Sequence, residues 1–421
     1  MNLTHLSSQT QLKQFKVTYH HPKSERPAPE LGVLEERWLH KIFLATHIPA
    51  TWNAGKIGLV LAVVTIIVWL VWWPLGPGAA VAAGLYFLFT VSDWLLLWWL
   101  NTSGASFGPV GPQLLVQNVP RLGAVAIAVL TAWVLGSPPL GLGLLFALQL
   151  IGSAVYLWGA LVEPFALNVT HRQLRPAAWP TDASPLRLLH LSDLHVERLT
   201  RRENHLLELI DQIQPDVMVI TGDYLNLSYV DDPTARAEVR KVLTQLDAPY
   251  GVYATLGSPP VDPRNTTPSL FDGTRIRLLR DEVAVIELAD GRKLSLIGMD
   301  CEHDLQSDAS ALNNLLDVTP ADSARVLLYH SPELMPVAQQ YDIDMYLCGH
   351  THGGQIRLPY YGAILTSSVT GKQYEMGPYT EQNTTLYVSR GIGLEGLSAP
   401  RMRLLCPPEI ILFNLAGTDP L

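Results

Sequence analysis

The chain has 421 residues, of which 48% are hydrophobic and only 16% charged, and its formal net charge is −9. Its charge is uneven: net +3 over residues 1–56, only Asp93 and Arg121 between residues 57 and 162, and net −12 over residues 163–421. The apolar middle excludes a wholly soluble protein, and the composition excludes a disordered chain or a disulfide-stapled mini-protein. The acidic C-terminal part argues against a nucleic-acid groove, which needs basic residues to replace phosphate counterions.

Residues 1–56 form a polar, basic tail whose first 30 residues lack the apolar stretch of a secretory signal peptide. Apolar residues recur in it at helical spacing, at positions 31, 34, 38, 39, 42 and 43. This pattern predicts either an amphipathic helix lying on the membrane surface or an ordinary helix in the cytosol.

Four apolar stretches follow, each close to the roughly 20 residues that a helix needs to cross the hydrocarbon core. We expect transmembrane helices at residues 57–73, 79–100, 114–136 and 140–162, which together make a membrane domain over residues 57–163. Arg121 is expected to snorkel or to sit at the interface. Asp93 is either a near-interface residue satisfied by another helix or a functional intramembrane carboxylate. No series of polar residues suggests a transport path, which argues against a transporter.

Basic residues predict the orientation of this domain. The short loops at residues 74–78 and 137–139 contain no Lys or Arg, whereas the tail contains seven, and Arg172 and Arg175 follow the fourth helix. Four crossings put the tail and the C-terminal part on one side, and the positive-inside rule makes that side cytoplasmic. An odd count of three cysteines agrees with a reducing compartment.

After a linker at residues 164–185, apolar strands alternate with helical faces, which predicts an α/β domain. Strands are expected at residues 186–191, 217–221, 252–256, 283–288, 294–297, 326–329 and 345–348, and helices at residues 202–213 and 233–246. Asp290-Gly291 between two of these strands is a strong hairpin signal.

Carboxylates and imidazoles follow these strands directly, at the strand ends where α/β folds gather their sites. They are Asp193 and His195, then Asp223, then His330, and finally His350 and His352. Mixed Asp and His side chains are typical ligands of first-row divalent metals. Glycines beside them, Gly222 and Gly349 among others, permit the close backbone turns that such a site requires.

These motifs resemble the pattern of the calcineurin-like metallophosphoesterase superfamily, which is D-x-H, G-D, G-N-H-[DE], H and G-H-x-H. The segment 348–356 and the ending at residues 388–393 and 407–410 look like the membrane-associated bacterial branch. The resemblance covers about residues 186–415, leaving a C-terminal tail at 416–421. It implies a two-sheet β-sandwich flanked by helices, with two metals at the sheet ends, in a protein of the bacterial plasma membrane.

The resemblance also implies the roles of the site residues. Asp193, His195 and His352 would hold the first metal, Asp223 would bridge, and His330 and His350 would hold the second. The implied cofactors are two divalent ions of the Mn, Fe or Zn type. The implied reaction is attack of a metal-bound hydroxide on phosphorus in a phosphodiester, pyrophosphate or phosphomonoester. The expected partners are membrane lipids and a phosphorylated small molecule or lipid-linked substrate, and the oligomeric state stays open.

One motif departs from the family. Where G-N-H-[DE] is expected, this chain has Gly257-Ser258-Pro259-Pro260. Ser258 replaces the Asn ligand, and Pro259 replaces the His that would act on the leaving group, so no catalytic side chain is expected beyond the metal-bound hydroxide. Ser258 could coordinate weakly through its hydroxyl, and Asp262 or His303 could substitute. Two hypotheses follow: a phosphoesterase with a weakened second site that favours acidic leaving groups, or a degenerate relative that binds metal or a phosphorylated ligand without turnover.

Overall fold

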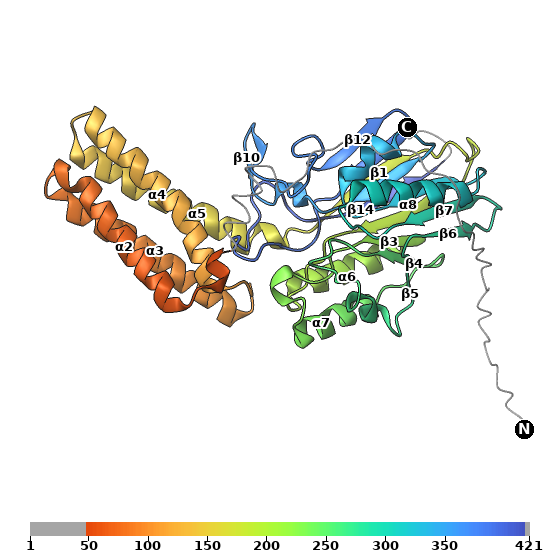
Figure 1. Ribbon diagram of the computed structural model, residues 1–421, viewed down its shortest axis with the longest axis horizontal. Coiled ribbons are helices and arrows are strands. Elements are labelled where there is room, and N and C mark those ends of the chain that lie inside the picture. The colour runs from red at the N-terminus through yellow and green to blue at the C-terminus, as the bar shows by residue number, and fades with distance from the viewer. Residues whose placement is uncertain (1–47, 417–421) are drawn as a thin grey trace, which may run out of the picture.

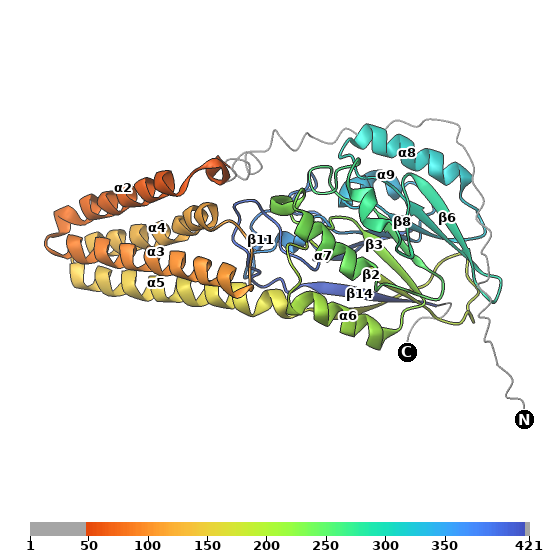
Figure 2. The same ribbon diagram turned by 90° about the horizontal axis from the view of Figure 1, so that it is seen from below.

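The computed structural model describes residues 48–416, which form a bundle of long helices followed by an α/β domain with two main sheets (Figure 1). The bundle extends away from one end of the sheets, so the two parts lie end to end (Figure 2). This confirms the expected fold class. The surface helix hypothesised around residues 31–43 and the tail from residue 417 onward lie outside the described residues. The first described element is a short 3-10 turn, Ile48–Thr51.

Four helices are long and apolar enough to cross a membrane, and they confirm the four predicted spans with ends shifted by a few residues. They are α2 (Ala54–Trp72), α3 (Gly78–Ser103), α4 (Val110–Val134) and α5 (Pro138–Leu161). Large apolar side chains, among them Leu59, Leu88 and Leu130, are exposed on the outside of the bundle. Such an all-round apolar surface suits lipid rather than water.

The expectation that Arg121 snorkels or sits at the interface is wrong. Arg121 is only 5% exposed and forms a two-pronged ion pair with Asp93, with Nη2–Oδ1 at 2.6 Å and Nε–Oδ2 at 2.9 Å. Its Nη1 also donates to the backbone and side-chain oxygens of Gln149, both at 2.8 Å. Asp93 is thus satisfied by another helix, and the pair joins α3, α4 and α5 because neither charge can stay unpaired inside the bundle.

The α/β domain contains two six-stranded mixed sheets. The strand order is β1-β14-β2-β3-β4-β5 in the first sheet and β12-β13-β9-β8-β7-β6 in the second. The strands of the first sheet are β1 (Asn168–Leu174), β2 (Leu186–Leu191), β3 (Val217–Thr221), β4 (Val252–Thr255), β5 (Ile276–Leu278) and β14 (Glu409–Leu415). Those of the second are β6 (Glu282–Glu287), β7 (Lys293–Gly298), β8 (Ala324–Leu328), β9 (Met345–Cys348), β12 (Gly377–Glu381) and β13 (Thr384–Val388). A small separate hairpin pairs β10 (Arg357–Leu358) with β11 (Gly362–Ala363).

The two sheets pack face to face as a sandwich. Leu188 and Val219 of the first sheet share one buried cluster with Val326 and Leu347 of the second. Helices α6 (Arg201–Ile213) and α7 (Pro233–Leu243) cover the outer face of the first sheet, and α8 (Leu305–Val318) and the short α9 (Met335–Ala338) cover the second (Figure 2). Alternating apolar residues on each strand therefore fill both the inner and the outer layers.

Part of the segment expected to be a linker, residues 164–185, belongs to the sheet instead. Strand β1 pairs in parallel with β14 along its whole length. Its sequence, Asn-Val-Thr-His-Arg-Gln-Leu, is polar because it is an edge strand whose residues are mostly exposed. Its partner lies more than 230 residues later in the chain, so no local pattern could predict the pairing.

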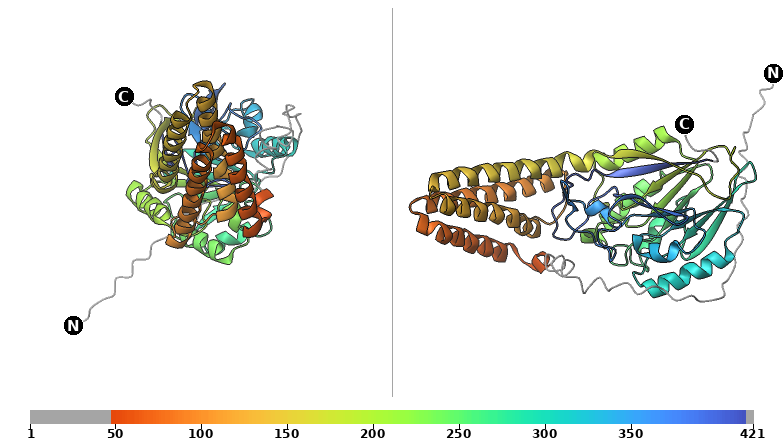
Figure 3. Two further views of the ribbon diagram at one scale, coloured as in Figure 1. Left: turned by 90° about the vertical axis from the view of Figure 1, so that its left-hand side faces the viewer. Right: turned by 90° about the horizontal axis from the view of Figure 1, so that it is seen from above.

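A segment near the C-terminus, residues 394–406, fastens the domain to the helices, and we call it the junction segment. The Arg401 backbone N–H donates to Gln113 Oε1 of α4 at 3.0 Å, and the Arg403 N–H donates to the Gly159 carbonyl of α5 at 2.9 Å. Met402 packs in one apolar cluster with residues of α3, α4 and α5. Figure 3 shows the C-terminal loops lying against the ends of the helices.

Candidate metal centre

The six side chains singled out in the sequence lie together at one end of the sandwich. Strands β2 and β3 are parallel in one sheet, β8 and β9 are parallel in the other, and the segments that follow these strands meet. The six are Asp193 and His195 after β2, Asp223 after β3, His330 after β8, and His350 and His352 after β9. Two groups of three, sharing Asp193, have ligand atoms within 4.8 Å of one another.

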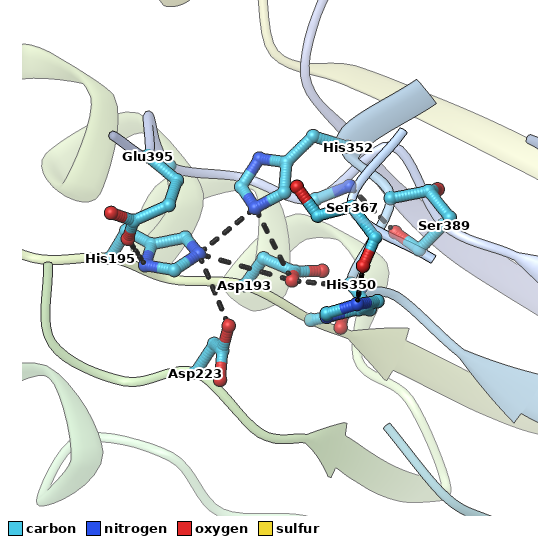
Figure 4. Close-up of polar contacts among 12 residues, drawn as sticks. Asp193, His195, Asp223, His350, His352, Ser367, Ser389 and Glu395 are labelled. Carbon is cyan, nitrogen blue, oxygen red and sulfur yellow. Dashed lines mark hydrogen bonds and ion pairs between the residues drawn. The ribbon is translucent and has the colours of Figure 1, made fainter. Parts of the chain in front are cut away.

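The first group surrounds His195 Nε2 (Figure 4). This nitrogen lies 2.9 Å from His352 Nε2, 3.5 Å from Asp223 Oδ2 and 3.9 Å from Asp193 Oδ1. His352 Nε2 lies 3.4 Å from the same Asp193 oxygen. All four side chains are buried, with at most 7% of any side chain exposed. Nitrogen and oxygen donors therefore face one point from several sides, as they do around a divalent cation.

The second group lies on the other side of Asp223. His330 Nε2 is 3.1 Å from Asp223 Oδ2 and 3.9 Å from Asp193 Oδ1. The His350 ring is next to it, with ring centroids 5.2 Å apart, and its Nδ1 lies 3.3 Å from Ser258 Oγ. Asp223 thus lies between the two groups, where a bridging carboxylate would have to be.

Each of three histidines has its outward nitrogen fixed by an acceptor. His195 Nδ1 lies 2.6 Å from Glu395 Oε2, His330 Nδ1 lies 2.6 Å from the Thr221 carbonyl, and His350 Nε2 lies 2.6 Å from the Ser367 carbonyl. An N–H on the outward nitrogen leaves the inward one with a free lone pair in the neutral ring. Outer partners of this kind orient metal-binding histidines.

The backbone at the cluster is strained. Asp193, His195, Asp223, His350 and His352 all have φ between 41° and 68°, the left-handed region that non-glycine residues rarely adopt. Such conformations cost of order 1–3 kcal/mol each and collect at functional sites. A Cβ on Gly349 would lie 2.0 Å from Asp193 Oδ2, so the sequence needs glycine there for the two segments to approach.

Nearby carboxylates control the protonation of two of these histidines. Burial opposes a positive charge on His195, but the carboxylates of Glu395 and Asp223 outweigh it and raise the pKa to about 9. Burial is likewise outweighed at His330, whose pKa Asp223 raises to about 10. Both rings therefore carry a proton at neutral pH when no cation is bound.

The two histidines of the G-H-x-H motif behave in the opposite way. Burial, reinforced by the positive charge of neighbouring histidines, lowers the pKa of His350 to about 3. Burial and the adjacent His195 also hold the pKa of His352 well below its usual range. These two rings are neutral and ready to donate lone pairs.

The cluster fits divalent cations on a direct observation. Asp193 Oδ2 is buried and has no hydrogen-bond partner among residues 48–416. An unpartnered, buried carboxylate oxygen is costly, and a cation removes that cost. The donor set of carboxylates and imidazoles is also that of a first-row metal site.

The departed motif lies at the edge of the cluster. The Ser258 backbone N–H donates to Asp223 Oδ1 at 2.8 Å, so Ser258 occupies the place expected for the family's Asn. Asp262 does not face the cluster. Its oxygens accept three backbone N–H groups, those of Asp223 at 2.7 Å, Gly257 at 2.8 Å and Tyr224 at 3.2 Å. It supports the loops rather than offering a ligand atom.

Two acidic residues of the site were missed by sequence reasoning. Glu395 contacts His195, and the buried Glu333 contacts His303 Nδ1 at 3.1 Å. Glu333 does follow His330 closely, directly after Ser331 and Pro332, which is a weak local signal. Glu395 lies 200 residues after its partner, and nothing near it in the sequence marks it.

A pocket at the junction of helices and domain reaches the first group. It is lined by Phe107 of the α3–α4 loop, by Phe165, and by His195, Arg198 and Arg202. Its wall therefore combines apolar rings from the helical part with basic side chains and one candidate ligand from the domain.

We expect metal loading to release about two protons per chain near neutral pH, because His195 and His330 must each lose a proton to bind a cation. Affinity should consequently fall as the pH is lowered from 9 toward 6. Calorimetric titration with Mn²⁺ in buffers of different ionisation enthalpy measures the release. Glu395→Gln should reduce the release by lowering the pKa of His195, whereas Glu208→Gln, on an exposed helix face, should not change it. Release near zero in the unaltered protein contradicts the prediction.

Comparison with known proteins agrees with this geometry. Residues 186–258 match the family model described as calcineurin-like phosphoesterase. The uncharacterized metallophosphoesterase YkuE of Bacillus subtilis is 29% identical over 284 residues, covering 66% of this chain and 95% of the relative. Phosphodiesterase YaeI of Escherichia coli is 26% identical over 250 residues, which cover 57% of this chain and 86% of the relative. The UDP-2,3-diacylglucosamine pyrophosphatase LpxG of Chlamydia muridarum is 22% identical over 318 residues, which cover 62% of this chain and 92% of the relative. The chain is thus similar to the calcineurin-like phosphoesterases, and these matches support a hydrolase acting on phosphoric ester bonds.

Proposed function

We propose that this protein is a membrane-anchored, metal-dependent phosphoesterase that acts on a lipid-linked pyrophosphate or phosphodiester. The observation that carries the proposal is the convergence of Asp193, His195, Asp223, His330, His350 and His352 at the ends of strands from both sheets. This buried Asp/His cluster lies at the same end of the domain as the membrane-type helices.

Each residue has an assigned part in the proposal. Asp193, His195 and His352 would hold one cation, His330 and His350 would hold the other, and Asp223 would contribute to both sites. Two such cations, of the Mn, Fe or Zn type, supply an activated water and neutralise charge on the phosphate oxygens. The outer acceptors Glu395, Thr221 and Ser367 keep the imidazoles oriented so that this arrangement is ready before substrate arrives.

The motif that differs from the family's, Gly257-Ser258-Pro259-Pro260, narrows the class of substrate that we propose. Pro259 stands where the family has a His and offers neither a titratable group nor a backbone N–H. Loss of a general acid typically costs roughly 10²–10⁴-fold, but less when the leaving group is itself acidic. A pyrophosphate or an activated diester has such a leaving group, so these substrates suit the site better than a simple alkyl phosphomonoester.

The surroundings of the site favour a substrate held in the bilayer. The pocket between Phe107, Phe165 and His195 opens where the helices meet the domain. Arg198 in its wall keeps part of its side chain exposed and can attract a phosphate, whereas Arg202 is paired with Glu203, and the two rings suit a headgroup boundary. The relative LpxG is named for a pyrophosphatase activity on a diacylated nucleotide sugar, which is a substrate of this chemistry.

The hairpin β10–β11 adds a second apolar surface beside the same helix ends (Figure 1). Four large apolar or aromatic side chains of residues 358–364 are exposed, namely Leu358, Tyr360, Tyr361 and Ile364. Ile356, just before the hairpin, packs against the cluster formed by α3, α4 and α5. We infer that the hairpin lies in the headgroup region, where aromatic residues are favoured.

Hydrolysis tests the central proposal. The purified full-length protein, loaded with Mn²⁺ in detergent, should hydrolyse bis-p-nitrophenyl phosphate and, more efficiently, UDP-2,3-diacylglucosamine in mixed micelles. Asp193→Asn should lower turnover by roughly 10²–10³-fold, because it removes a negative ligand and so weakens binding of the cation that activates water and neutralises the phosphate oxygens. His205→Ala, at a partly exposed position on α6 away from the cluster, should retain full activity. No turnover with any of Mn²⁺, Fe²⁺ or Zn²⁺ would favour the degenerate, non-catalytic hypothesis.

Fluorescence tests the placement of the hairpin. The three native cysteines of residues 48–416 are buried, so Tyr360→Cys can be labelled selectively with an environment-sensitive fluorophore. In nanodiscs that contain brominated lipids we expect a blue-shifted, quenched emission. The same label at Asp290→Cys, on the β6–β7 turn at the opposite end of the sheets, should be neither shifted nor quenched. Equal behaviour of the two positions would disprove the membrane placement.

The orientation is also proposed. Four crossings would put the start of α2, the α3–α4 loop and the phosphoesterase domain on one side of the membrane, and the basic residues before α2 would make that side cytoplasmic by the positive-inside rule. In bacterial cells a green fluorescent protein fused after Leu421 should fluoresce, and alkaline phosphatase fused there should be inactive. Active alkaline phosphatase at this position would reverse the orientation and place the site outside the cytoplasm.

A further inference from the structure

The second metal site lacks one expected ligand. Ser258 occupies the position of the family's Asn and is held there by the bond from its N–H to Asp223 Oδ1. A serine hydroxyl is one carbon from the backbone, so it reaches less far than an asparagine amide does. Space that an Asn side chain would fill must therefore be filled by another group.

His303 fills this space from the other sheet. It follows β7 and projects toward Ser258, with Nε2 at 3.1 Å from Ser258 Oγ. His350 Nδ1 lies 3.3 Å from the same oxygen, and the two imidazole rings are 4.8 Å apart between centroids. Two nitrogen atoms and one hydroxyl oxygen thus gather beside the bridging carboxylate. The buried Cys301 Sγ, 3.7 Å from His303 Nε2, is a further neighbour.

The orientation of His303 is that of a metal ligand. Its Nδ1 lies 3.1 Å from Glu333 Oε2. Glu333 is 1% exposed, and its other oxygen accepts the Val369 N–H at 3.0 Å and the Ser368 hydroxyl at 3.2 Å. This fixed carboxylate keeps the N–H on Nδ1 and leaves Nε2 facing the cluster, the arrangement found behind metal-bound histidines.

A second observation sets His303 apart from ordinary core histidines. Its φ is 57°, in the same left-handed region as five of the six predicted ligands. His303, Glu333 and His350 also form a third group whose ligand atoms lie within 4.8 Å of one another. Asp262, the other candidate substitute, is occupied by three backbone N–H groups.

We propose that His303 Nε2, assisted by the Ser258 hydroxyl, replaces the family's Asn and completes the second metal site with Asp223, His330 and His350. The proposal rests on the proposed function for the identity of the other ligands. It makes the second site complete rather than weakened, with an imidazole where the family uses an amide.

Metal stoichiometry of the full-length protein in detergent tests this directly. After loading with Mn²⁺ and removal of excess ion, elemental analysis should give two ions per chain, with the electron paramagnetic resonance signal of a coupled pair. His303→Ala should retain one ion and lose the coupling. Glu333→Gln should bind the second ion roughly 10–100-fold more weakly, because it removes the orienting partner. His205→Ala, which changes a partly exposed histidine of α6, should keep both ions.

A compensating variant keeps the test independent of folding. Ser258→Asn in the His303→Ala background restores the family's ligand and should recover the second ion and the coupled signal. Two ions bound with unchanged affinity in His303→Ala, or failure of Ser258→Asn to recover the second ion, would overturn the proposal. Hydrolysis is a separate readout. If the unaltered protein shows no turnover while His303→Ala loses one ion, the proposed function is refuted and this inference stands. If the unaltered protein turns over substrate and His303→Ala keeps both ions and its activity, this inference is refuted and the proposed function stands.

Discussion

Two buried carboxylates determine the organisation of this domain. Asp193 and Asp223 are 0% and 3% exposed, and two like charges in a dry site cannot both persist without compensating positive charge. Their oxygens also hold the loops together: Asp193 Oδ1 accepts the His350 N–H at 3.0 Å, and Asp223 Oδ1 accepts the Ser258 N–H at 2.8 Å. The two carboxylates thus connect segments from both sheets, and the left-handed backbone of these segments is sustained by those connections.

The helical bundle is connected to this site by more than a covalent linker. The junction segment contacts α4 and α5 through Arg401 and Arg403, and the same segment carries Glu395, which holds His195. The Arg401 side chain is fully buried and donates from Nε to Glu197 Oε1 at 2.8 Å, two residues beyond His195. A displacement of the helices would therefore reach His195 through a short chain of buried polar contacts. The helices thus contact the segments that hold the candidate site as well as being long and apolar enough to cross a membrane.

Sequence reasoning succeeded where the signal was local. The four long apolar helices follow from runs of apolar residues, and the meeting of the six candidate ligands follows from short motifs directly after apolar strands, whose ends meet once the strands are parallel. It failed where partners were distant. Arg121 was expected at the interface because no local pattern shows that it pairs with Asp93 on another helix. Strand β1 was expected as a linker because its partner, β14, lies at the far end of the domain sequence. Glu395 lacked any local signal for the same reason.

The sequence shows that Gly257-Ser258-Pro259-Pro260 differs from the family's motif. It does not show which residue takes over from the missing Asn, because the proposed replacement, His303, comes from the opposite sheet. The family model matches as far as Ser258, the residue at which the pattern changes. With His303 as the proposed ligand, three side chains of the second site come from segments after β7, β8 and β9, and Asp223 and the assisting Ser258 come from segments of the first sheet. The spacing of the two cations then depends on how the sheets pack, through Val219, Val326 and their neighbours in the shared core. Under the proposed function, Pro259 offers no proton donor at the family's position, so the site would favour substrates whose leaving groups depart without a proton.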